Sequence, residues 1–194
     1  MSSFSGHAAG PGAQVFWLFG LSGAGKSTLA AVLATELRRA GHGVLALDGD
    51  RLREGLSAGL GFAAADRREN LRGAAEVARL GCESGLVVVA SFITPAEEQR
   101  ALVRGIVGAD RLALVHVDTP LAVCAARDVK GLYAGAASGA VRGLTGVGAA
   151  FEPPQDCDLR LATAGESVLA TADRLMRFAQ ARLRGGTAAA AALG

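Results

Sequence analysis

The sequence has few cysteines and no long apolar run, and its charges nearly balance. Cys82, Cys124 and Cys157 show neither a CxxC spacing nor a Cys/His pattern, so they predict reduced thiols and no metal centre. The formal net charge of +2 is too small to favour broad nucleic-acid binding. Apolar runs such as residues 86–90 are far too short to cross a membrane, and residues 1–12 lack the pattern of a secretory signal. These absences predict a cytoplasmic protein that binds neither nucleic acid nor membrane.

Short runs rich in leucine or β-branched residues alternate with helical patterns along the 194 residues, a length typical of one domain. The predicted strands are residues 14–19, 43–47, 86–90 and 112–117. The predicted helices begin near residues 26, 66, 95 and 165 and end near residues 40, 84, 107 and 183. This alternation predicts an α/β fold, with a parallel sheet of about five strands and helices on both faces. Ligands of such folds bind beyond the carboxyl ends of the strands.

The chain ends and one internal segment differ from this pattern. Residues 1–13 are predicted to form a disordered N-terminal segment, residues 14–184 the folded domain, and residues 185–194 a low-complexity tail. Residues 129–150 are rich in glycine and fit no periodicity. We therefore expect them to form a structureless, mobile lid.

Gly20, Gly25, Lys26 and Ser27 match the pattern G-x-x-x-x-G-K-[ST], between a predicted strand and a predicted helix. The glycines let backbone N–H groups turn onto phosphate oxygens, Lys26 reaches the β- and γ-phosphates, and the Ser27 hydroxyl completes a Mg²⁺ shell. The other ATP-binding residues expected in this loop are Ser22, Gly23, Ala24 and Thr28. A chance match is the alternative in a chain with 27 glycines, but the strand-to-helix context is the one that the chemistry requires. The pattern predicts ATP and Mg²⁺ as cofactors.

Acidic and basic residues follow the second predicted strand in the segment LDGDRLR. Asp48 and Asp50 are two residues apart, so one carboxylate can bind Mg²⁺ while the other accepts a proton from an attacking hydroxyl. Arg53, one turn on, can pair with an anionic acceptor. The alternative makes Asp48 a turn residue and Asp50 a helix N-cap. The strand at 86–90 ends without the Asp that a nucleotide switch or motor places there, which favours a kinase.

The segment LGFAAADRRENLR adds Phe62, Arg67 and Asn70. Arg67 and Asn70 are three residues apart and share a helical face. Alternatively, Phe62 is a core residue or a hydrophobic staple, and the polar pair is a solvated face.

Seven segments together resemble the adenylyl-sulfate (APS) kinase family of P-loop kinases in order and spacing over residues 14–163. They are GLSGAGKST, LDGDRLREGL, LGFAAADRRENLR, SFITP, ARDVKGLY, GLTGV and FEPP. The resemblance implies a homodimer with a small-molecule substrate. It also implies transfer of the ATP γ-phosphate to the ribose 3′-hydroxyl of APS, which gives PAPS, the activated sulfate donor.

The resemblance also implies a role for individual residues. Asp50 is the base for the 3′-hydroxyl, and Asp48 helps to hold Mg²⁺. The residues implied for the acceptor are Arg53, Arg67 and Asn70 at the phosphosulfate and ribose, Phe62 at the adenine, and Ile93 and Thr94 in the pocket wall. Arg127 borders the nucleotide base, and Lys130 lies near the transferring phosphates.

Four parts of the sequence depart from the family's usual pattern. Thr94 stands where a Ser is usual, Ala96-Glu97 replaces Tyr-Arg, and residues 134–137 read AGAA where several basic residues are usual. Leu144 stands where a Phe usually covers the other face of the acceptor adenine. Two alternatives stay open: a related kinase that phosphorylates another small anionic metabolite or nucleotide, and a nucleotide-binding module without catalysis. The complete phosphate loop and the two acids argue against the module.

Overall fold

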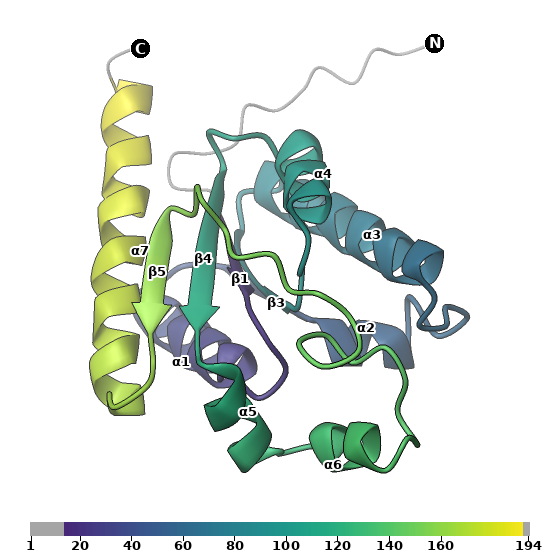
Figure 1. Cartoon of the computed structure of the whole chain (residues 1–194). Helices are drawn as coiled ribbons and strands as arrows, with labels where there is room; N and C mark the ends of the chain where they lie inside the picture. The colour runs from purple at the N-terminus through teal and green to yellow at the C-terminus, as the bar shows by residue number, and fades with distance from the viewer. Residues whose placement is uncertain (1–13, 192–194) are drawn as a thin grey trace, which may run out of the picture.

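The structure, a computed structural model, describes residues 14–191 and the side chains of residues 14–185. The segment predicted to be disordered, residues 1–13, lies outside the described residues. Five parallel strands form one sheet in the order β2-β3-β1-β4-β5 (Figure 1). The strands are β1 (Val15–Phe19), β2 (Val44–Asp48), β3 (Val87–Phe92), β4 (Leu112–Asp118) and β5 (Leu159–Ala162). The predicted parallel α/β sheet is therefore confirmed.

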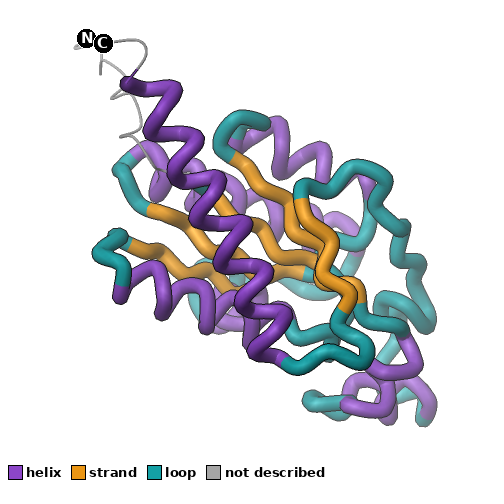
Figure 2. Tube along the Cα trace, turned by 90° about the vertical axis from the view of Figure 1, so that its left-hand side faces the viewer, coloured by secondary structure: helices purple, strands orange, loops and turns teal. Residues whose placement is uncertain are grey.

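Helices cover both faces of the sheet, as Figure 2 shows. They are α1 (Lys26–Arg39), α2 (Gly49–Glu54), α3 (Ala64–Glu83), α4 (Glu97–Val107), α5 (Leu121–Arg127), α6 (Leu132–Ala137) and α7 (Val168–Ala191). None of the helices within residues 14–191 combines the length and the hydropathy needed to cross a lipid bilayer.

Alternate residues of the central strand β1 face opposite hydrophobic cores. Phe16 and Leu18 pack with apolar residues of α1 and α7, whereas Trp17 packs with apolar residues of α3 and α4. All five residues of β1 are fully buried. The predicted apolar face of α3 is confirmed, because Leu71, Ala75, Ala78 and Cys82 all belong to the second core. The central position of β1 therefore fixes the loop that follows it between two packed layers.

Three predicted helix limits and one missed strand need correction. Pro95 does not lie in the first turn of α4, because the helix begins at Glu97 after the N-cap Ala96. The last helix begins at Val168, where the Ser167 hydroxyl accepts a hydrogen bond from the Ala170 N–H. It does not end at Leu183, because the alanine-rich segment has high helix propensity and continues α7 to Ala191. The missed strand, β5, has four residues and only one buried side chain, too little for a visible alternation.

The segment predicted as a structureless lid, residues 129–150, contains the short helix α6. Asp128 stabilises the start of this helix, because its carboxylate accepts hydrogen bonds from the Tyr133 and Ala134 N–H groups, both at 2.9 Å. A helix of six residues is too short to show a periodic pattern in the sequence. The prediction that the segment lacks structure was wrong, and its mobility stays a prediction.

Two glycines of α3 provide a test of how closely this helix approaches the sheet. A methyl group at Gly73 meets no atom within 4 Å, so Gly73→Ala should raise the free energy of unfolding by about 1 kcal/mol through helix propensity. A methyl group at Gly81 would lie 2.8 Å from Leu45 Cδ2 and 3.2 Å from Val88 Cγ2. Gly81→Ala should therefore give no such gain in urea denaturation. Equal gains at both positions would contradict the close packing of α3 on the sheet.

Candidate active site

One cleft at the carboxyl edge of the sheet collects the predicted site residues, with the exception of Gly20. The predicted residues that line it are Ser22, Gly23, Ala24, Gly25, Lys26, Ser27, Thr28, Asp48, Asp50, Arg53, Phe62, Arg67, Asn70, Ile93, Thr94, Arg127, Lys130 and Leu144. They come from the segments that follow β1, β2, β3 and β4, as expected for ligand binding in a parallel sheet.

Gly20 shapes the cleft from behind. Its φ is +150°, and a Cβ atom there would lie 2.5 Å from the Val117 carbonyl oxygen, so no larger residue fits. Gly23 and Gly25 also have positive φ, at +76° and +102°. These three positions let the chain reverse sharply between β1 and α1. The result is a concave loop, residues 20–27, called the phosphate loop below.

Lys26 is a buried cation that folds back over the phosphate loop. Its Nζ donates a hydrogen bond to the Leu21 carbonyl at 2.7 Å. Burial, followed by repulsion from Lys130, lowers the pKa of Lys26 to about 8. A bound polyphosphate would place negative charge beside the Lys26 ammonium group and so stabilise its charged form.

Asp48 lies at the centre of a hydrogen-bonded cluster. Its Oδ2 accepts hydrogen bonds from the hydroxyls of Ser27 and Ser91, both at 2.7 Å, and its Oδ1 accepts one from the Asp50 N–H at 3.0 Å. Partial burial opposes ionisation, but the bonds from Ser91 and Ser27 outweigh it and hold the pKa of Asp48 below its usual value. Asp48 is also the N-cap of α2, so the alternative that gave this cap to Asp50 was wrong.

Asp50 is more exposed and pairs with a residue of the predicted lid. Its carboxylate forms an ion pair with Lys130, and the two side chains are 64% and 50% exposed. Exposure at this level means that the pair can open at little cost in free energy, because water solvates both charges once they separate. The candidate base is therefore close to the phosphate loop and is held by a cation that can move away.

The acceptor side of the cleft carries arginines and one aromatic ring. The Arg53 guanidinium lies 4.5 Å from the centre of the Phe62 ring, which is 71% exposed. Arg67 donates hydrogen bonds to the carbonyls of Phe62 at 2.8 Å and Gly143 at 2.9 Å, so it ties the lid segment to α3. The buried Oδ1 of Asn70 has no hydrogen-bond partner among the described residues. A polar ligand could satisfy that oxygen.

Thr94 and Leu144 are less accessible than their predicted roles suggest. Thr94 is 1% exposed with φ +39°, and its hydroxyl accepts a hydrogen bond from Trp17 Nε1 at 2.9 Å. Leu144 is 7% exposed and belongs to the core on the α1 side. Both residues line the cleft, but their side chains mainly pack against the protein.

Sequence reasoning missed three residues that support the site: Ser91, Thr119 and Tyr133. Ser91 is the register partner of Asp48 on the neighbouring strand, and its position directly after a predicted strand was a usable signal. Tyr133 and Thr119 donate hydrogen bonds to the Ser22 and Ala24 carbonyls, both at 2.9 Å. No spacing in the sequence indicates these long-range contacts.

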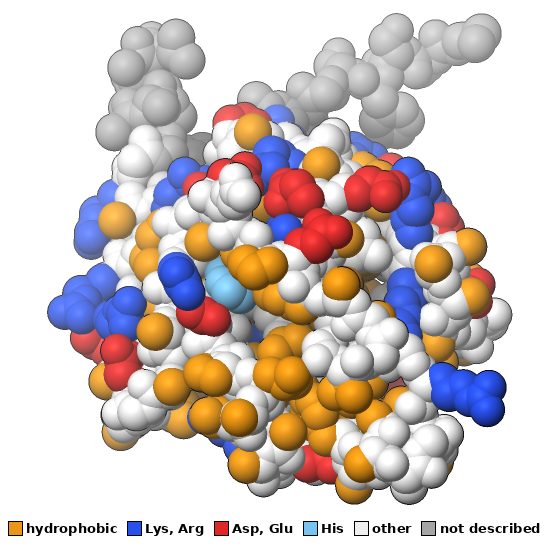
Figure 3. All heavy atoms as spheres, viewed as in Figure 1, with side chains coloured by type: hydrophobic (Ala, Val, Ile, Leu, Met, Phe, Trp, Pro, Cys, Tyr) orange, Lys and Arg blue, Asp and Glu red, His pale blue; other side chains and the backbone are white. Residues whose placement is uncertain are grey.

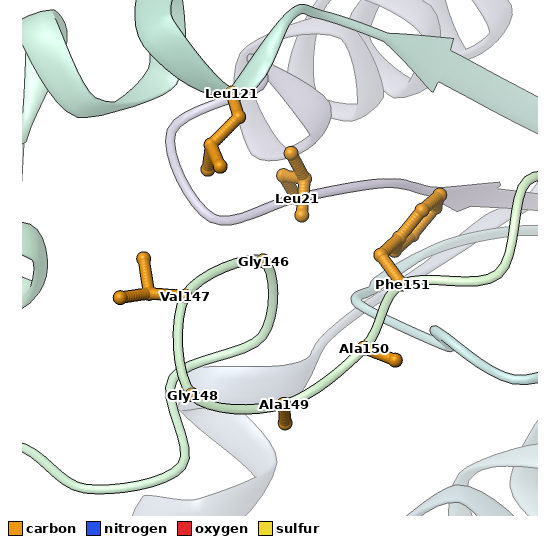
Figure 4. A pocket seen from close by; sticks show the side chains of 8 residues that line it. All are labelled: Leu21, Leu121, Gly146, Val147, Gly148, Ala149, Ala150 and Phe151. Carbon is orange, nitrogen blue, oxygen red and sulfur yellow. The ribbon is translucent and has the colours of Figure 1, made fainter.

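A second hollow lies between residues 146–151 and the side chains of Leu21 and Leu121. Figure 4 shows Leu21, Leu121, Val147 and Phe151 around it, and the remaining lining residues are Gly146, Gly148, Ala149 and Ala150. Figure 3 shows apolar side chains gathered over the lower half of this face, where α5 lies. Among the residues that the structure describes, no polar side chain lines this hollow, whereas the first cleft is lined by lysines, acids and arginines, so we assign the chemistry to the first cleft.

The phosphate loop, its buried lysine and the paired acids at the edge of a parallel sheet define the class of P-loop phosphotransferases. Sequence comparison identifies the family within this class. The profile of the family described as adenylylsulphate kinase matches residues 12–162, and the chain belongs to this family.

Named relatives agree with this assignment. An adenylyl-sulfate kinase of Aeromonas salmonicida is 48% identical over 162 residues, which cover 84% of this chain and 83% of the relative. One from Escherichia coli K12 is 48% identical over 147 residues, or 76% of this chain and 73% of the relative. The structure of the Mycobacterium tuberculosis APS kinase in complex with AMPPNP and APS matches with a TM-score of 0.83 and 40% identity, and covers 88% of this chain and 99% of that one.

The oligomeric state of a further structural relative differs from the expected homodimer. A hexameric APS kinase from Thiobacillus denitrificans matches with a TM-score of 0.66 and 27% identity over 91% of this chain and 30% of that one.

The lowered pKa of Lys26 predicts how nucleotide affinity depends on pH. In the protein without nucleotide, the Lys26 ammonium group loses its proton above about pH 8. Because bound phosphates favour the ammonium form, binding then takes up a proton, and the Kd for ADP should rise by up to about tenfold per pH unit. Calorimetry from about pH 7 to about pH 9.5, in buffers that differ in ionisation enthalpy, measures both effects. A constant Kd over this range, without proton uptake, would show that Lys26 keeps an ordinary pKa.

Proposed function

We propose that this protein transfers the γ-phosphoryl group of ATP to the ribose 3′-hydroxyl of APS, so that ADP and PAPS are formed. One observation carries the proposal: a single cleft is lined by the phosphate loop, by Asp50, and by Arg53, Arg67 and the exposed ring of Phe62. A donor and an acceptor can therefore meet in one place. We expect the reaction to occur in the cytoplasm, and the homodimer implied by the resemblance stays a prediction that light scattering can test.

ATP binds with its phosphates against the phosphate loop, where the N–H groups and Lys26 meet their negative charge. Arg127 is available to border the adenine base of ATP. Its Nη1 donates a hydrogen bond to the Gly23 carbonyl at 3.2 Å and so lies beside the loop. Lys130 then leaves Asp50 for the transferring phosphates. Lys130 and Lys26 lie near enough to repel each other in the free protein, so both can reach the same phosphates. This exchange frees the Asp50 carboxylate.

The acceptor nucleotide binds with its adenine on Phe62 and its anionic group near Arg53, Arg67 and Asn70. The Asp50 carboxylate accepts the proton of the 3′-hydroxyl. The 3′-oxygen forms a bond to the γ-phosphorus, and the bond from that phosphorus to the β,γ-bridging oxygen breaks, so that ADP leaves. Closure of the predicted lid, within residues 129–150, over the reactants would exclude water as a competing acceptor.

The residues around Ser27 fit a magnesium ion. The Ser27 hydroxyl and an ionised Asp48 carboxylate are hard oxygen donors 2.7 Å apart at the mouth of the phosphate loop. No cluster of three or more His, Cys, Asp or Glu side chains suited to a metal occurs among residues 14–185. Mg²⁺ needs no such cluster, because it commonly uses one or two carboxylates together with the phosphates of the substrate. When bound, the ion would neutralise charge on the β- and γ-phosphates.

An ADP-release assay with a panel of acceptors tests the proposal directly. The panel contains APS, adenosine 5′-phosphate, adenosine 3′-phosphate and hydroxylated sulfonates, with ATP and Mg²⁺ in each reaction. APS should give the highest kcat/KM. A clear preference for another anionic hydroxyl compound would favour the related-kinase alternative, and ATP binding without transfer to any acceptor would favour a module without catalysis.

Asp50→Asn should keep ADP binding but lower kcat by about 10²- to 10⁴-fold, because general-base assistance contributes about that factor. Asp173→Asn is the control, since Asp173 lies on α7 and pairs with Arg177 outside the cleft. Steady-state kinetics and calorimetry separate the two effects. An unchanged kcat with an altered Mg²⁺ dependence would exchange the roles of Asp50 and Asp48.

Phe62→Ala should raise the KM for APS by about five- to 150-fold and leave kcat nearly unchanged, because base–aromatic stacking contributes about 1–3 kcal/mol in both the ground state and the transition state. Phe62 is 71% exposed, so its removal should not disturb the core. Leu80→Ala removes another exposed apolar side chain, 54% exposed on α3, and should change neither constant. An equal KM in all three proteins would show that the acceptor base does not stack on Phe62.

A further inference from the structure

Two carbonyl groups of the phosphate loop accept hydrogen bonds from buried hydroxyls. The Tyr133 hydroxyl of α6 donates to the Ser22 carbonyl, and the Thr119 hydroxyl after β4 donates to the Ala24 carbonyl, each at 2.9 Å. Tyr133 is 8% exposed and Thr119 is 4% exposed. Both bonds therefore form away from water, where a hydrogen bond constrains its partners most strongly.

Each bond fixes the direction of a neighbouring N–H group. In a trans peptide, the carbonyl of one residue and the N–H of the next point in opposite directions. A Ser22 carbonyl that faces Tyr133 therefore turns the Gly23 N–H to the other side of the loop, and an Ala24 carbonyl that faces Thr119 does the same for Gly25.

The N–H groups of the loop differ in the way that this geometry requires. Among the described residues, the Gly23 and Gly25 N–H groups have no hydrogen-bond acceptor, whereas the Ala24 N–H donates to the Leu21 carbonyl at 3.2 Å. The Gly23 and Gly25 N–H groups, which are not the only N–H groups of the loop without an acceptor, belong to the two peptides that the hydroxyls hold. They are thus kept available for an anion on the concave side.

We propose that Tyr133 and Thr119 are positioning residues of the phosphate loop, which hold two peptide planes so that the Gly23 and Gly25 N–H groups face the nucleotide phosphates. The inference rests on the proposed binding of ATP in this cleft. Neither hydroxyl reacts, and both act through the loop backbone. Without the Tyr133 hydroxyl, the Ser22 carbonyl could turn inward and oppose the phosphates. Without the Thr119 hydroxyl, the Ala24 carbonyl would keep only the 3.5 Å bond from Arg127 Nη1.

The Tyr133 hydroxyl is a dependable donor. Burial raises the pKa of Tyr133 to about 12, so the group keeps its proton over the range in which the enzyme can work. Helix α6, which carries Tyr133, is fixed by Asp128, whose carboxylate accepts a hydrogen bond from the Tyr133 N–H. Tyr133 therefore links the first part of the lid segment to the phosphate loop and holds α6 against it.

Tyr133→Phe removes the hydroxyl and keeps the ring. Calorimetry with AMPPNP and with inorganic triphosphate should each show a Kd about two- to tenfold higher than that of the natural protein, as expected for the loss of one buried hydrogen bond. The KM for the acceptor should not change. Thr35→Val is the control, because the Thr35 hydroxyl also donates to a main-chain carbonyl, at 2.8 Å, but on the exposed side of α1.

Thr119→Val, which keeps the side-chain shape, should weaken both probes in the same direction. Amide NMR separates positioning from a general loss of stability. The Gly23 resonance should move and broaden in the free Tyr133→Phe protein, while its melting temperature changes little. The Gly25 resonance should do so in Thr119→Val, where loss of the bond to the buried Thr163 hydroxyl should also lower the melting temperature.

Triphosphate binding at the natural affinity in both variants would overturn the inference, as would unchanged Gly23 and Gly25 resonances. These results are independent of the acceptor. If APS were not phosphorylated while triphosphate binding still weakened in the variants, the proposed function would fail and the positioning role would stand.

Discussion

The sharp reversal of the chain after β1 is the constraint on which the site depends. A loop that surrounds phosphates must turn its N–H groups inward, and its carbonyls must then find donors on the outside. Positive φ at Gly23 and Gly25 makes the turn possible, and the contact of Gly20 with the Val117 carbonyl brings it close to β4. The outer carbonyls can be satisfied only because β4, α5 and α6 pack against the loop. The sheet thus supplies the phosphate site with its outer support as well as its position.

Electrostatics adds a second constraint to this geometry. Two cations, Lys26 and Lys130, and two acids, Asp48 and Asp50, share a small volume in the free protein. Asp48 is stabilised by serine hydroxyls and stays ionised, whereas Lys26 is destabilised by burial. The Asp50 ion pair with Lys130 balances the remaining charges. In the proposed mechanism, a polyphosphate would attract both lysines and so release the Asp50 carboxylate for the acceptor.

The sequence predicted those parts of the structure that rest on local patterns. Buried strands and the apolar face of α3 follow from periodicity, and the phosphate loop follows from a spacing with one well-defined geometry. The clustering of Lys26, which follows β1, with Asp48, which ends β2, could be expected because polar residues after parallel strands meet at one edge. Helix α6 and strand β5 were missed because they are too short for a periodic signal.

Long-range pairs were beyond sequence reasoning for a different reason. The bond between Tyr133 and the Ser22 carbonyl joins residues 111 positions apart, and that between Ser91 and Asp48 spans 43 positions. Which hydroxyl meets which carbonyl depends on the relative placement of several elements, and a propensity carries no information about this. Ser91 was visible only as a polar residue at a strand end, and its partner became clear once the register of β2 and β3 was known.

The two halves of the cleft differ in how firmly they are built, and this difference bears on specificity. On the nucleotide side, Lys26 and the supporting hydroxyls of Thr119 and Tyr133 are buried, so a substitution there disturbs packed structure. On the acceptor side, Phe62 and Asp50 project from exposed positions. Exposed side chains can be exchanged with little effect on stability. The phosphate half suits a donor whose chemistry never changes, while an exposed acceptor residue such as Phe62 can be exchanged without disturbing the fold.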